Sequence, residues 1–237
     1  MRKTKASKNS SQADVKNRDI LDLTKLSDIG ANLIDEVGEV TINSFLQMDS
    51  LKNIPLVGPA INAVRGVLSV RDYFFARKVL EFLRTAPKIS PEARQKFKAK
   101  LDSDPNFAKH TASYLTVILD RLDDIEKTTL LARLFGALVS EKIDQEQHRR
   151  LSTALERAFL SDLHALRQFL FQKVTMTMAT FDGLQAAGLV FVDHSIIRPR
   201  DPAVVYGQIG NLHFGVPSIS QLLVEVAFEE KRGFEGG

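Results

Sequence analysis

The chain of 237 residues contains no cysteine and no tryptophan. Without cysteine it can form no disulfide framework, no thiolate nucleophile and no cysteine-type zinc site. Its five histidines are scattered, and none stands in an HExxH-type ligand pattern. The glycines at 207 and 210 are not followed by the Lys-Ser/Thr pair of a phosphate-binding loop. We therefore expect no metal site, no cofactor and no catalytic centre.

The sequence also lacks an apolar run long enough to cross a membrane. The best window, residues 54–68, is short and contains Asn62 and Arg65, whereas a span needs about 20 mostly apolar residues. No apolar segment of the signal-peptide type follows the basic start. We expect a cytoplasmic protein, with association to an anionic membrane through an interfacial helix as an alternative.

The net charge of +3 is unevenly distributed. The first 18 residues carry six cations against the single carboxylate of Asp14, so the remainder of the chain has a net charge of −2. With almost no apolar residues, residues 1–18 are predicted to form a disordered basic tail. A tether to acidic lipid or nucleic acid is the alternative use of that tail. The folded part does not show the basic excess typical of a nucleic-acid-binding protein.

The most apolar long segment runs from Ile54 to Arg84. Its prolines, Pro55 and Pro59, can stand only at or before a first helical turn. Beyond them the apolar residues recur at spacings of three and four, which predicts a helix so apolar that other helices, or in part lipid or a partner, must surround it. We expect the chain to be organised around this helix. The candidate apolar interaction surface consists of Val57, Ile61, Val64, Leu68 and Phe75.

Further helices are predicted from their period and their N-cap signals. The helical period covers residues 19–48. Later starts are signalled at Ser90-Pro91, Asp104-Pro105, Asp123 or Asp124, Asp144, and Ser161-Asp162. We expect Phe159 to face inward at the end of the helix that Asp144 begins. Because the breaks are short, neighbouring helices should pack antiparallel.

The last quarter of the chain has a different pattern. A short helix over Met178–Ala187 is expected to end at Gly188 in the left-handed conformation. Strands are predicted near Leu189–Phe191 and at Leu212–Phe214. Ser218 or Ser220 should cap a final helix.

Together these patterns predict a mainly α protein, in which a multi-helix bundle precedes a small winged-helix-like α+β unit. The expected boundaries are a disordered tail over 1–18, the helical bundle over 19–159, the winged-helix-like unit over 160–232 and a tail over 233–237.

Three hydrophobic segments carry a family resemblance: Leu131–Ala137, Phe159–Leu166 and Leu184–Val190. With these segments, the plan of the chain resembles the abortive-infection-alpha type of bacterial phage-defence protein, in which a helical region leads into a winged-helix-like end. The resemblance covers about the last half of the chain. It implies a role in anti-phage defence without a known enzymatic centre.

Three functions follow as hypotheses. We expect a non-enzymatic interaction protein that acts through protein–protein contacts or as a homo-oligomer. The first alternative is a winged-helix DNA-binding regulator, although the groove-reading helix would carry Asp182 and no lysine or arginine, which suits phosphate poorly. Its candidate anion or nucleic-acid contacts are Lys173, Arg198 and Arg200. The second alternative is a membrane-active effector that exposes residues 54–68.

Overall fold

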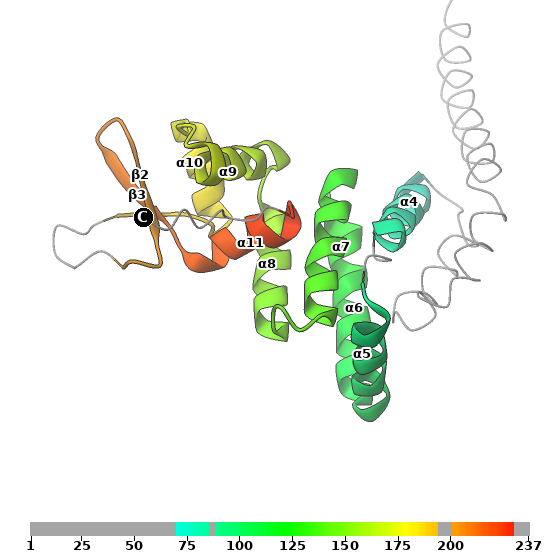
Figure 1. The fold of residues 1–237 in the computed structure, drawn as a ribbon. Coiled ribbons are helices and arrows are strands. Elements are labelled where there is room, and N and C mark those ends of the chain that lie inside the picture. The colour runs from blue at the N-terminus through cyan, green and yellow to red at the C-terminus, as the bar shows by residue number, and fades with distance from the viewer. Residues whose placement is uncertain (1–69, 86–88, 194–200, 230–237) are drawn as a thin grey trace, which may run out of the picture.

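The computed structural model describes residues 70–85, 89–193 and 201–229. This part of the chain is mainly helical and carries a small antiparallel sheet near its C-terminal end (Figure 1). In chain order the elements are α4 (Val70–Thr85), α5 (Pro91–Ser103), α6 (Pro105–Arg121), α7 (Ile125–Val139), α8 (Gln145–Arg157), α9 (Leu160–Gln172), α10 (Met178–Ala186), β1 (Phe191–Val192), β2 (Val205–Ile209), β3 (Leu212–Val216) and α11 (Ser218–Ala227). The prediction of a mainly α chain with a small mixed region is confirmed at this level.

Four of the predicted helix starts are confirmed by their N-cap hydrogen bonds. The Ser90 hydroxyl accepts from the Ala93 amide at 3.2 Å, and the Asp104 carboxylate accepts from the Phe107 amide at 2.9 Å. Asp124 begins α7 in the same way, and Asp144 begins α8 with a full capping box. These side chains accept hydrogen bonds from amides that have no partner within their own helix. Because the two groups are neighbours in the sequence, the start of such a helix can be predicted from the sequence alone.

Two predicted caps are wrong. Helix α9 begins at Leu160 after Phe159 and has no side-chain cap, because Asp162 falls at the third helical position. Helix α11 begins directly after Pro217, again without a side-chain cap, and Ser220 lies buried inside the helix. In both cases packing against other helices, rather than a local hydrogen bond, determines where the helix starts.

Helix α7 is the centre of the described part, a position that the sequence pattern assigned to Ile54–Arg84. It packs against α4, α5, α8 and α11, and 10 of its 15 residues are buried. Its buried Lys127 is tolerated because the ammonium lies 2.7 Å from the Asp123 carboxylate. Only the end of the segment 54–84 is described, as α4.

Helix α4 turns one face toward α7. The rings of Phe82 and Phe135 lie 5.5 Å apart at the contact between the two helices. Lys78 of α4 donates to the carbonyls of Asp120 and Leu122 at 2.8 Å each, where α6 ends. The cation therefore ties α4 to the negative end of the α6 dipole. Within the described residues no helix is long and apolar enough to cross a membrane.

The sheet has the strand order β1-β3-β2, and both pairings are antiparallel. Gly188 has the left-handed φ of 77° that was expected at the end of α10, and it delivers the chain into β1. The predicted strand at Leu212 is confirmed as part of β3, whereas β2 was not predicted. Its pairing places Gly207 opposite Phe214, and a central glycine weakens the strand signal in the sequence.

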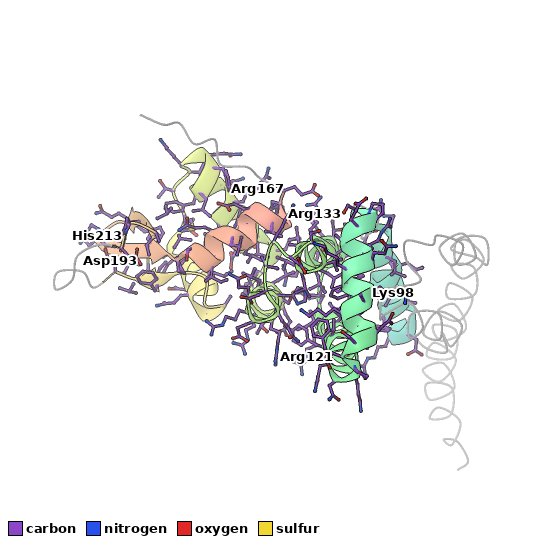
Figure 2. All side chains as sticks on the ribbon, turned by 60° about the horizontal axis from the view of Figure 1, so that its bottom comes forward. Lys98, Arg121, Arg133, Arg167, Asp193 and His213 are labelled. Carbon is purple, nitrogen blue, oxygen red and sulfur yellow. The ribbon has the colours of Figure 1, made fainter. Side chains whose placement is uncertain are left out.

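One cluster of buried residues includes side chains from α4 through α11, on both sides of residue 160. Helix α11 returns from the sheet to pack on α7, α8 and α9, which Figure 1 shows in red beside the green helices. Arg133 of α7 donates to the Ala227 carbonyl at the end of α11 at 2.8 Å (Figure 2). The division of the chain at residue 160 stays a prediction.

Candidate interaction surface

The short helix α10 is placed by a defined turn after α9. Lys173 ends α9 in the left-handed conformation, with a φ of 56°. The Thr177 hydroxyl then caps α10 by accepting from the Thr180 amide at 3.2 Å. These local interactions fix the start of α10.

The two faces of α10 differ sharply in burial. Phe181 and Leu184 are buried against the core, and the Phe181 ring lies 5.6 Å from that of Phe214 in β3. The opposite face is exposed and consists of Met178, Ala179, Asp182, Gln185 and Ala186. Its residues recur at the spacing that puts them on one side of a helix. The side chains of this face are partly apolar, and Asp182 gives the face its one negative charge.

Phe159 lies beside this face, and 65% of its surface is exposed. A Cβ added to Gly183 of α10 would lie 3.8 Å from its ring. The expectation that Phe159 faces inward is wrong. Ala158 takes the buried position, and the extended backbone of Phe159 at the start of α9 turns its ring outward.

The contact between α9 and α10 depends on Asp162 and Gly183. The Asp162 carboxyl is so close to the Gly183 backbone that an added Cβ would collide with it. Burial raises the pKa of Asp162 above its usual range, because loss of water disfavours the charged form. Glycine thus permits the approach that places Phe159 next to α10.

One further apolar side chain, Val174, is exposed in the segment between α9 and α10. We use the name α10 surface for Phe159, Val174, Met178, Ala179, Asp182, Gln185 and Ala186. Exposed apolar side chains that gather at one helix are typical of surfaces that contact another protein.

Most of the predicted site residues lie outside the described residues: Val57, Ile61, Val64, Leu68, Arg198 and Arg200. Phe75 is half-buried and packs against the core. Lys173 is exposed at the end of α9. The sequence analysis did not single out a row of arginines on α8, namely Arg149, Arg150 and Arg157. Their spacing of seven and eight residues, about two helical turns, would have indicated that they lie on one side of the helix.

Three aspartates near the α6–α7 junction have structural roles, and only one of them is a helix cap. Asp120 pairs with Arg71, Asp123 with Lys127, and Asp124 caps α7. Within the described residues no group of three or more histidines and carboxylates could hold a metal ion. In the sheet, the Asp193 amide donates to the His213 carbonyl at 2.8 Å, and Figure 2 shows the two residues side by side.

Comparison of this chain with protein-family models, with curated proteins and with solved structures gives no match.

Proposed function

We propose that this chain is a non-enzymatic helical interaction protein of bacterial anti-phage defence, which acts in the cytoplasm through protein–protein contacts or self-association. The observation that carries the proposal is the α10 surface, where Phe159 exposes 65% of its surface beside a partly apolar helix face. Burial of a large aromatic side chain by a partner is favourable, and aromatic residues are enriched in protein interfaces.

We further propose that α9, α10 and the three strands form a winged-helix-like unit used for protein contact. A helix pair joined by a short turn and followed by the β2–β3 hairpin supports this interpretation. The DNA-reading alternative receives less support, because the exposed face of α10 has Asp182 and no cation. The membrane-active alternative rests on residues 54–68, which lie outside the described part.

The role in defence rests on the family resemblance of three segments. Their apolar residues Leu131, Leu134, Leu163, Leu166, Leu184 and Leu189 all belong to one buried cluster. The resembling pattern therefore lies in the part of the chain that holds the helices and the α10 surface together.

The experiment compares the wild-type protein with the double variant Phe159→Ser/Met178→Ser. Bacteria that express each protein are challenged with a panel of phages, and the purified proteins are studied by sedimentation velocity. We expect the wild type to lower plaque formation and the double variant to lose that protection. If the surface mediates self-association, the variant also sediments as a smaller species.

The control variant is Val117→Ser, which replaces an exposed apolar residue on α6, away from the α10 surface. Circular dichroism checks that each variant keeps its helices. Absence of protection by the wild type would contradict the role in defence. Full protection and unchanged sedimentation of the double variant would contradict the role of the α10 surface.

A further inference from the structure

Two adjoining hollows lie between α8 and the first half of α11. They have volumes of about 490 and 570 Å³ and share Glu146, Arg150 and Ile219 in their walls. We therefore treat them as one feature, the α8–α11 groove. The turn at Gly188 also lines the first hollow. Each hollow falls in the size range of small-molecule sites, about 300–1,000 Å³.

The groove is rich in positive charge. Arg149, Arg150 and Arg157 of α8 line the first hollow, against the single carboxylate of Glu146. Arg150 donates through Nε to Glu146 at 2.8 Å, so both of its terminal nitrogens retain donors for another group. Within the described part of the chain Arg157 has no ion pair. Glu225 adds a second carboxylate, in the other hollow.

The N-terminus of α11 faces the same groove, since Ser218, Ile219 and Ser220 lie in its walls. No side chain caps this helix, and the Ser220 amide donates to the Pro217 carbonyl at 3.0 Å. The amides of Ser218 and Ile219, which precede Ser220 in the chain, have no acceptor within the helix. They are therefore free donors at the N-terminus of α11. The helix dipole adds positive potential at this end.

Ser220 supplies an independent indication of a ligand. The residue is completely buried in the wall of the first hollow, and its hydroxyl has no hydrogen-bond partner. An unsatisfied buried hydroxyl is costly, so such groups in folded proteins usually have a partner that completes them. A ligand oxygen in the first hollow would accept this hydrogen bond.

We propose that the α8–α11 groove binds a phosphate-bearing ligand. Arg150 and Arg157 bind phosphate oxygens through their planar guanidinium groups, which suit this geometry. The free amides of α11 and the Ser220 hydroxyl complete the set of donors. Because the groove extends over two hollows, it has room for more than one phosphate, as in a nucleotide or a short stretch of nucleic-acid backbone. The groove and the α10 surface share no residue, so the proposed function and this site can fail separately.

The experiment titrates the full chain with ATP and, separately, with a short single-stranded DNA oligonucleotide by isothermal titration calorimetry. Saturable binding of ATP alone identifies a free nucleotide as the source of the phosphate. Binding of the oligonucleotide that weakens steeply with added salt identifies a nucleic-acid backbone. Absence of saturable binding by both probes at low salt would overturn the proposal.

Substitutions then locate the site. Arg150→Ala and Arg157→Ala should each weaken binding about tenfold, the value expected for a lost charge-assisted hydrogen bond. Ser220→Ala should weaken binding by a smaller factor. Glu146→Gln should strengthen it several-fold, since it removes the carboxylate that competes for Arg150. A gain in affinity cannot result from misfolding.

The matched control is Arg121→Ala, which removes the same charge from an exposed position at the end of α6, outside the groove. This variant should bind like the wild type. If Arg150→Ala and Arg157→Ala weaken binding no more than Arg121→Ala does, the groove is not the site.

Discussion

The buried imidazole of His148 makes a direct prediction about stability at acidic pH. His148 lies on α8 with 2% of its surface exposed, and its ring packs edge-on against Tyr114 and Phe135 at 6.2 Å from each. Its Nε2 atom has no hydrogen-bond partner. Burial therefore lowers the pKa of His148 from 6.5 to about 4, because no nearby acceptor or anion compensates the lost hydration of the imidazolium.

A lowered histidine pKa stabilises the folded state at neutral pH relative to acid. Above the unfolded pKa the imidazole is neutral in both states, and its contribution is fully present. As the pH falls from 6.5 toward 4, the unfolded chain binds a proton that the folded chain does not, so the free energy of unfolding decreases. The complete loss is about 3.4 kcal/mol, and about 2.5 kcal/mol of it falls between about pH 7.5 and about pH 4.5.

The perturbation is His148→Leu, which keeps an apolar side chain of similar size and removes the titrating group. Urea unfolding of both proteins, followed by circular dichroism at about pH 7.5 and about pH 4.5, gives a double difference in which the other titrating groups cancel. We expect the wild type to lose about 2.5 kcal/mol more than the variant between these pH values. His110→Leu is the control, because His110 is exposed on α6.

A double difference below about 1 kcal/mol would contradict this account of His148, because a pKa even one unit closer to the unfolded value would still give about 1.8 kcal/mol. A His110→Leu variant with the same double difference would also refute it, since the effect would then not depend on burial.

Two further predictions concern the α9–α10 turn. Lys173→Gly should raise the free energy of unfolding by about 1 kcal/mol, because Lys173 has a left-handed φ of 56° that glycine adopts without strain. Urea unfolding measures the change. A loss of stability would contradict this prediction and show that the lysine side chain makes an important contact. Asp162→Asn should stabilise the protein at neutral pH, since burial raises the pKa of the Asp162 carboxyl and disfavours its charged form. The gain should disappear below about pH 4, where the carboxyl is protonated in both states, and an equal gain at both pH values in thermal unfolding would contradict this cause.

Helix positions were predictable wherever the signal was local. Ser90, Asp104, Asp124 and Asp144 each accept a hydrogen bond from an amide two or three residues further along. Such a bond depends on the sequence next to it and little on the rest of the fold. The end of α10 was predictable for a similar reason, because glycine adopts the left-handed conformation that ends a helix and Gly188 has it.

The candidate site was less predictable. Phe159 continues the helical period of α8 in the sequence, yet the break between α8 and α9 turns its ring into the solvent. Likewise, the free N-terminus of α11 meets the arginines of α8 only because α11 folds back over more than 60 residues of chain onto α8. Period and propensity are local quantities, and neither contains information about such long-range contacts.

The amino-acid sequence alone is enough to predict the mainly helical class, the absence of cysteine chemistry, and the helix starts that depend on a neighbouring amide. Long-range packing places α7 at the centre of the described part, buries the Ser220 hydroxyl and the His148 Nε2 atom without a hydrogen-bond partner, and exposes Phe159. Burial depends on how all the helices share one core, so the environment of a side chain is fixed by residues far away in the chain.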